Sequence, residues 1–244
     1  MIILGVDPSL TSTGIVVLDK SGVLIHREVL HTKPQIGKGK DKRDTWVVER
    51  LLTQKARIED IFKKFEITDV CIEAPLQGSY STEILYAVQM FYHAACYQAG
   101  VRTLWINNTA WKGLNNIPTK SGAAKLASID LARKLLNQTT GKFSDHEADA
   151  YHVARCGKRF LELLDGIIEE SDLTPQERST YLKSHTMTRG KNIGQVNKTG
   201  MMFKIKENLF NYHTTPTTGD TNGRSTSSAR STNEIKKKRK GHGG

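Results

Sequence analysis

Residues 3–18 read "ILGVDPSLTSTGIVVL", two apolar runs joined by a short polar stretch, and this pattern decides the fold. Both runs are short and bounded by turn-forming residues, which is typical of buried strands. The first run stops on a carboxylate, Asp7. Because Asp is an ordinary turn residue, Asp7 is either part of a simple turn or a functional carboxylate at the end of a strand.

The remainder of the first 170 residues alternates between apolar strands and amphipathic helices. Further strands are expected at residues 23–29, 67–73 and 101–107, and helices at residues 44–65, 81–99, 119–137 and 145–169. A meander followed by alternating helices and strands indicates an α/β fold with one mixed sheet and helices on its faces. We therefore expect a folded domain over 1–170 and a disordered basic tail over 211–244, with a basic appendage over 171–210 whose fold the sequence does not define.

The positive charge is concentrated in the C-terminal third of the chain. The net charge is +11; residues 171–244 carry 14 Lys and Arg against 5 Asp and Glu, and the first 170 residues carry 22 against 20. A basic extension on a nearly neutral domain is typical of a protein that binds a polyanion, most often nucleic acid. The alternative is a charge run that only increases solubility.

Composition argues against several other classes of protein. No apolar run approaches the roughly 18 residues of a membrane span, and the first residues, "MIILGVD", lack the basic front of a secretory signal. Cys71, Cys96 and Cys156 are scattered without a CxxC pair. They are expected to be free, mostly buried thiols in a reducing compartment, so we predict a cytoplasmic protein without membrane contact.

Acidic residues stand at three element ends that could meet in space. Asp7 ends the first expected strand, Glu73 ends the fourth, and His146 and Asp149 lie three residues apart at the start of the last long helix. Like charges brought together repel unless a cation lies between them. An oxygen-rich cluster favours Mg²⁺ or Mn²⁺, and two such ions about 4 Å apart can activate a water and stabilise the leaving oxygen of a phosphodiester.

These stretches resemble a known family. "ILGVDPSLTSTG" is similar to the first motif of the RuvC-type Holliday junction resolvases of the RNase H-like superfamily, "VCIEAP" to the second and "DHEADAYHVA" to the last. The resemblance covers residues 1–160 with motif order and spacing preserved. It implies a mixed five-stranded sheet flanked by helices, and a homodimeric endonuclease that uses two Mg²⁺ or Mn²⁺ ions per active site to nick opposed strands of a four-way junction.

The resemblance also implies roles for single residues. By motif, Asp7, Glu73, His146 and Asp149 match the metal-binding and catalytic positions, with Asp145 in reserve. The fourth position is Asp in some members and His in others, and the imidazole of His146 would shift the preference toward Mn²⁺.

Other residues are candidates for contact with DNA. Lys112 and Lys120 lie where the family keeps phosphate-contacting lysines, whereas Lys125 is expected on a solvated helix face. Tyr80 could stack on a base or simply pack. The aromatics Trp105 and Trp111 are expected in the core.

Two features depart from the cellular members of the family. The stretch after the second motif, "APLQGSYSTEILYAVQM", lacks their aromatic pattern, and the basic tail is unusually long. The added basic tail, together with the free thiols, is expected of a phage-encoded relative acting in the cytoplasm of its bacterial host. The helix at 81–99, apolar on more than one side, could form the subunit contact or a central core helix.

Three other functions stay open at this point. The first is a non-catalytic module that binds branched DNA, although every expected ligand position is occupied. The second is a related nuclease that acts on RNA–DNA hybrids or on DNA ends. The third is an actin-like or sugar-kinase-type ATP-binding protein, which "DPSLTSTG" also resembles, but the chain shows no second phosphate-binding motif.

Overall fold

The computed structural model describes residues 1–32, 43–74, 82–118, 121–137, 142–182, 185–186, 196–197 and 203–205. One compact unit spans Met1–Tyr212. The second unit, His213–Gly244, lies outside the described residues, as does the predicted disordered tail. Among the described helices, none is long and apolar enough to cross a membrane.

The elements follow the predicted alternation of strands and helices. The strands are β1 (Ile3–Asp7), β2 (Ser12–Leu18), β3 (Leu24–His31), β4 (Asp69–Glu73), β5 (Arg102–Ile106), β6 (His185–Thr186), β7 (Val196–Asn197) and β8 (Phe203–Ile205). The helices are α1 (Arg43–Phe65), α2 (Thr82–Ala99), α3 (Asn108–Leu114), α4 (Ser121–Leu135), α5 (Asp145–Leu164) and α6 (Pro175–Tyr181), with a 3-10 turn at Glu170–Asp172.

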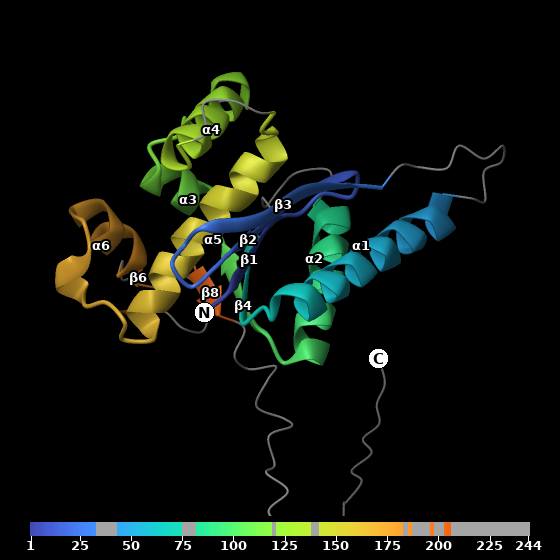
Figure 1. Ribbon diagram of the computed structural model, residues 1–244, viewed down its shortest axis with the longest axis horizontal. Helices are drawn as coiled ribbons and strands as arrows, with labels where there is room; N and C mark the ends of the chain where they lie inside the picture. Colours follow the sequence, from blue (N-terminus) through green and yellow to red (C-terminus); the bar gives the residue numbers. More distant parts are fainter. Residues whose placement is uncertain are drawn as a thin grey trace, which may run out of the picture. The chain divides into compact units, whose positions relative to one another are not determined.

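The main sheet has the strand order β3-β2-β1-β4-β5-β8 (Figure 1). The pairs β1–β2 and β2–β3 are antiparallel, whereas β1–β4 and β4–β5 are parallel. The predicted five-stranded mixed sheet is therefore confirmed. The short strand β8 adds a sixth strand, antiparallel to β5, that the sequence reasoning did not predict.

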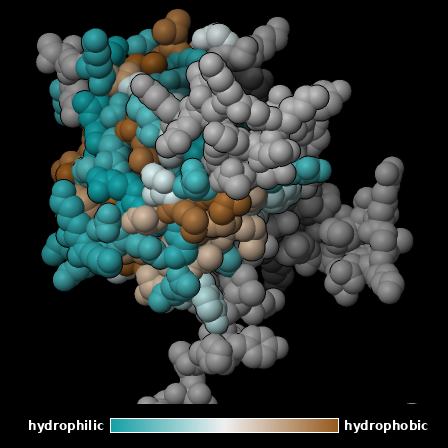
Figure 2. Space-filling view, turned by 90° about the vertical axis from the view of Figure 1, so that its right-hand side faces the viewer, coloured by the Kyte–Doolittle hydropathy of each residue, from teal (hydrophilic) through white to brown (hydrophobic). Residues whose placement is uncertain are grey.

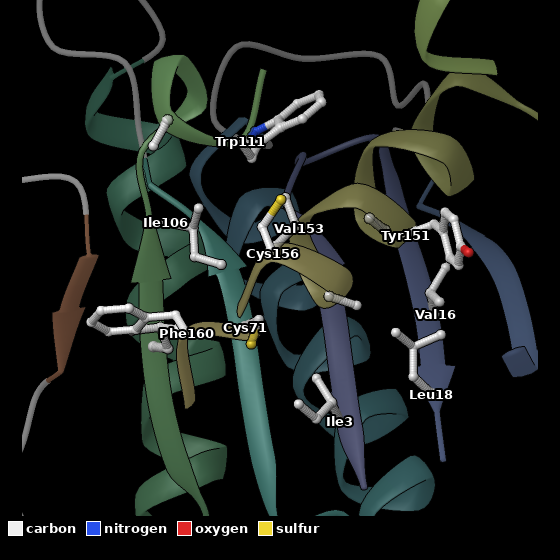
Figure 3. Close-up of a cluster of buried hydrophobic side chains, with 14 of the residues drawn as sticks. Ile3, Val16, Leu18, Cys71, Ile106, Trp111, Tyr151, Val153, Cys156 and Phe160 are labelled. Atoms are coloured by element: carbon white, nitrogen blue, oxygen red, sulfur yellow. The ribbon is translucent and has the colours of Figure 1, made fainter. Parts of the chain in front are cut away.

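Side chains alternate between the two faces of the sheet. On β1, Ile3 packs in a cluster with residues of α5, and Leu4 and Val6 pack in a second cluster with residues of α1 and α2. This period of two is that of a strand buried on both faces. Helices α1 and α2 lie on one side of the sheet and α5 on the other (Figure 1), and Figure 3 shows side chains of the α5-side cluster.

Helix α5 lies unusually close to the strands because glycines face it. A Cβ atom added at Gly5 would lie 2.4 Å from the carbonyl oxygen of Ala150, and one added at Gly14 would lie 2.0 Å from that of His146. Near the other end of the helix, a Cβ atom at Gly157 would lie 2.2 Å from the Sγ atom of Cys71. At Gly5 and Gly14 the strand backbone packs directly on the backbone of α5, and at Gly157 the helix backbone packs on the Cys71 side chain, which together fix the position of α5.

Several sequence-based expectations need adjustment. The predicted helix 119–137 is α4, and the predicted helix 145–169 ends at Leu164. Helices α3 and α6 were not predicted. All three cysteines are free and buried, as expected; Trp111 is fully buried, and Trp105 packs against the α1–α2 cluster, so both aromatics belong to the core as predicted.

Candidate active site

The ends of β1 and β4 bring two carboxylates to the same edge and the same face of the sheet. The parallel pair is in register from Ile3 opposite Asp69 to Val6 opposite Ile72, so the following residues, Asp7 and Glu73, are neighbours. Because alternate residues of a strand share a face, Asp7 points to the same side as Ile3, which packs against α5. The sequence hypothesis that the two carboxylates emerge side by side is consistent with this register.

The start of α5 is fixed by a capping box. The Ser144 hydroxyl accepts a hydrogen bond from the backbone N–H of Glu147 at 3.1 Å, and the Glu147 carboxylate accepts one from the backbone N–H of Ser144 at 2.8 Å. This motif satisfies two orphan donors of the first turn. It sets where the helix begins, and hence where His146 and Asp149 lie.

His146 contacts Asp7 directly. The Nδ1 atom of His146 lies 2.9 Å from Oδ2 of Asp7, and both side chains are partly buried. The hydrogen bond and the charge of Asp7 raise the pKa of His146 above its ordinary value. A residue of the first sequence motif is thereby in contact with a residue of the last motif.

Glu73 and Asp149 are buried carboxylates with raised pKa values. Burial, followed by the charge of Asp7, raises the pKa of Glu73 well above its ordinary value, and the same two causes raise the pKa of Asp149 to about 6. Glu73 accepts a hydrogen bond from Nδ2 of Asn108, and Asp149 accepts one from Oγ of Ser128 at 2.5 Å. These hydrogen-bonding partners are neutral, so neither supplies a compensating charge.

The donor set fits a hard divalent cation in its chemistry. Three carboxylates and one imidazole are the ligand types that Mg²⁺ and Mn²⁺ accept. The pKa values of Glu73 and Asp149 are raised by burial and then by the charge of Asp7, and a bound cation would offset both effects. In the described part of the chain, however, no three His, Cys, Asp or Glu side chains are grouped as a formed metal site.

Two lysines interact with acidic residues of the candidate site. Lys112 in α3 is half-buried, and its Nζ atom lies 5.1 Å from the centre of the Trp111 ring. Its charge partly offsets the rise in the pKa of Asp149. The Nζ atom of Lys125 lies 2.5 Å from Oδ2 of Asp145. Lys125 is thus exposed as expected but paired, and it engages the carboxylate held in reserve. The candidates Lys120 and Tyr80 lie outside the described residues.

Sequence reasoning missed the two neutral residues that contact the carboxylates. Asn108 lies two residues beyond the end of β5, the strand parallel to β4, and a polar residue just after a parallel strand was an available signal. Ser128 is a small polar residue inside α4, and nothing in its sequence context distinguishes it from other helix residues.

The fold has counterparts among solved structures. RuvC of Thermus thermophilus in complex with a Holliday junction substrate matches with a TM-score of 0.50 and 21% identity, over 63% of this chain and 90% of that chain. Another structure of Thermus thermophilus RuvC matches at 22% identity, with the same TM-score and coverage. A fowlpox virus resolvase in complex with Holliday junction DNA matches at 16% identity with a TM-score of 0.39, over 66% of this chain and 99% of that chain.

Comparison by sequence adds no relatives to these. No protein-family model matches the chain, and no curated protein sequence matches it significantly. The order of the strands, the register of β1 with β4 and the placement of α5 nevertheless agree with the motif-based expectation. The chain has the RuvC-like, RNase H-like fold that its sequence motifs predicted.

Proposed function

We propose that this protein is a metal-dependent endonuclease that nicks opposed strands of four-way, or otherwise branched, DNA junctions. One observation carries the proposal: at one edge of a RuvC-like sheet, Asp7 and Glu73 end neighbouring parallel strands, and the charge of Asp7 contributes to raising the pKa of both Glu73 and Asp149. A position at strand ends suits catalysis, because a rigid sheet holds the groups while loops and helix starts leave them accessible.

Asp7, Glu73 and Asp149 would hold two divalent ions, with His146 at the fourth position. When bound, Mg²⁺ or Mn²⁺ supplies an activated water and stabilises the leaving oxygen of the phosphodiester. Asn108 and Ser128 would orient the carboxylates of Glu73 and Asp149 through their hydrogen bonds. Outer partners of this kind commonly matter about 10- to 100-fold for metal affinity or activity.

The DNA backbone would be held by basic residues around this cluster. Lys112 is the described candidate, and the influence of its charge on Asp149 supports a position where it can contact a phosphate next to the cluster. Lys120 and Tyr80 stay proposals from the sequence. The basic residues of 211–244 would add affinity for any DNA by counterion release, without selecting the junction.

Two symmetric nicks require two active sites related by a two-fold axis, so we propose a homodimer. Support comes from Tyr86, Met90 and Tyr97, which are 38%, 51% and 41% exposed and recur on one side of α2 at helical spacing. Val48 and Leu52 of α1 are also exposed. Hydrophobic residues are visible on the side of the molecule where these two helices lie (Figure 2).

The dimer is tested by placing a charge in this surface. Met90→Glu should turn a dimer into a monomer in sedimentation equilibrium, and should replace paired nicks by single ones. The matched control is Ile167→Glu, which changes an exposed apolar residue just beyond α5 and should leave the dimer intact. A wild-type protein that is monomeric at all concentrations, with junction present or absent, would contradict the dimer.

The function is tested on a labelled four-way junction beside a linear duplex of matched sequence, with Mg²⁺, with Mn²⁺ and with chelator. Paired nicks that need metal should appear with wild type and vanish with Asp7→Asn. The control is Asp19→Asn, which changes a carboxylate at the far end of β2 that caps the turn to β3 and can still accept its hydrogen bonds. Binding without cleavage would leave a DNA-binding module, and preferential cutting of hybrids or flaps would indicate another nuclease of this fold.

A further inference from the structure

Three buried polar side chains meet on the side of the sheet opposite α5. They are Thr13 of β2, Gln54 of α1 and Tyr92 of α2, and each is 0% exposed. Their surroundings are the apolar cluster formed by β1, β2, α1 and α2. Because burying a polar group is costly unless it is hydrogen-bonded, three such groups in an apolar core call for a specific role.

The three side chains bind one another and one short turn. Tyr92 donates its hydroxyl hydrogen to Oε1 of Gln54, and its oxygen lies 3.2 Å from Oγ1 of Thr13. Gln54 donates from Nε2 to the carbonyl oxygens of Ser9, at 2.9 Å, and Leu10, at 3.2 Å. Thr13 donates to the carbonyl of Ser9 at 2.7 Å and accepts from the backbone N–H of Ser9 at 3.1 Å.

The turn that they bind, residues 8–11, directly follows Asp7. The backbone of Asp7 pairs with Gly14, the neighbour of Thr13, so the network reaches both strands at the level of this carboxylate. The negative charge of Asp7 also contributes to raising the pKa of Tyr92, after the larger effect of burial.

A network of this kind holds its partners in a single arrangement. The hydrogen bonds among the three side chains are buried, and those to Ser9 and Leu10 are partly buried. An unsatisfied partner in such surroundings is costly, so alternative conformations of the turn are disfavoured. Apolar residues could fill the same volume, but they would leave the carbonyls of Ser9 and Leu10 without these donors.

We propose that Thr13, Gln54 and Tyr92 are positioning residues, which hold the turn at residues 8–11 and thereby the carboxylate of Asp7. The proposal rests on the proposed function, in which Asp7 binds metal. Helices α1 and α2 lie on the face of the sheet opposite to the carboxylates of the candidate site. The proposal gives these helices a part in setting the geometry of the metal site.

Tyr92→Phe removes one hydroxyl from the network and preserves the shape of the core. The matched control is Tyr181→Phe, since Tyr181 is also buried and its hydroxyl donates to the backbone carbonyl of Cys156, on the opposite face of the sheet. Both variants remove a buried tyrosine hydroxyl, so both should lower the melting temperature. Thr13→Val serves as a second variant of the network.

Two readouts separate positioning from stability alone. Hydrogen exchange of the backbone amides of residues 9–13 should become about 5- to 10-fold faster in Tyr92→Phe, the factor that one lost hydrogen bond corresponds to. Mn²⁺ binding, measured without DNA by electron paramagnetic resonance, should weaken about tenfold. Thr13→Val should change both readouts in the same direction, and Tyr181→Phe should leave both at wild-type values.

The inference is overturned if Tyr92→Phe and Tyr181→Phe lower stability alike while exchange in residues 9–13 and Mn²⁺ affinity stay at wild-type values. A failure of the proposed function gives a different pattern, in which wild type neither binds Mn²⁺ nor cuts junctions. In that event the exchange measurement, which needs neither metal nor DNA, still decides whether the network holds the turn.

Discussion

Gly14→Ala tests whether the close approach of α5 to β2 builds the candidate site. The new Cβ atom would lie 2.0 Å from the carbonyl oxygen of His146, whereas real Cβ contacts are essentially never shorter than 3.0 Å, so the start of α5 must retreat by about 1 Å. The obstacle is backbone inside a helix and cannot swing aside. Overpacking of this kind costs about 1–3 kcal/mol, which for a domain of this size lowers the melting temperature by about 2–12 °C.

The same displacement would separate His146 and Asp149 from Asp7. A misplacement of about 1 Å can cost roughly 100-fold in rate, so single-turnover cleavage of a labelled junction, with protein in excess, should slow by about two orders of magnitude. Gly166→Ala is the control: Gly166 has a φ of +67° just beyond α5, and an added Cβ there meets no atom within 4 Å. It should lose stability through backbone strain and keep its cleavage rate. The reasoning is refuted if Gly14→Ala melts and cleaves like wild type.

Further predictions follow from the contacts of the cluster. Ser128→Ala should weaken Mn²⁺ binding about 10- to 100-fold by freeing the Asp149 carboxylate, and titration calorimetry should detect this; unchanged affinity would remove Ser128 from the site. Asp149 has a folded-state pKa of about 6, above its ordinary value, so its ionisation destabilises the metal-free protein progressively as the pH rises from about 4 through 6. Asp149→Asn should therefore be more stable than metal-free wild type at pH 7, by about 1–3 kcal/mol in urea unfolding, and no more stable at pH 4; an equal difference at both pH values would contradict this. Lys112→Ala should weaken junction binding and reduce its salt dependence, which a filter-binding titration over several salt concentrations can check. Deleting residues 211–244 should weaken binding of duplex and junction alike, and a loss confined to junctions would show that the tail selects structure.

Most of the fold follows from local sequence patterns. The apolar runs that become β1, β2, β4 and β5 are short and bounded by turn residues, and the amphipathic stripes of α1 and α5 repeat at helical spacing. The ends of β1 and β4 carry the acidic residues of the motifs, so the strands and the candidate site were predicted together. The elements that were predicted correctly are those that a short segment of the chain specifies through its own sequence.

The missed features depend on partners distant in sequence. Strand β8 has three residues and forms by pairing with β5, about 100 positions earlier. Ser128 acquires its role only because α4 packs on α5, so its context as a small helix residue carries no signal. Gln54 likewise looks like an ordinary polar residue of α1, and only the tertiary structure places it beneath the turn after Asp7.

Asp7 is held in place from both faces of the sheet. Substitutions of the residues that hold it and substitutions of the buried carboxylates should change stability in opposite directions. On one face, Gly14 admits the backbone of α5; on the other, Tyr92 and its partners bind the turn. Changes in these residues should lower stability and activity together. The buried carboxylates act in the opposite sense, because burial and mutual repulsion disfavour their ionised forms in the metal-free protein. Removing the charge of Asp149 should therefore abolish cleavage while raising stability, so stability measured beside activity distinguishes the residues that perform the chemistry from those that position them.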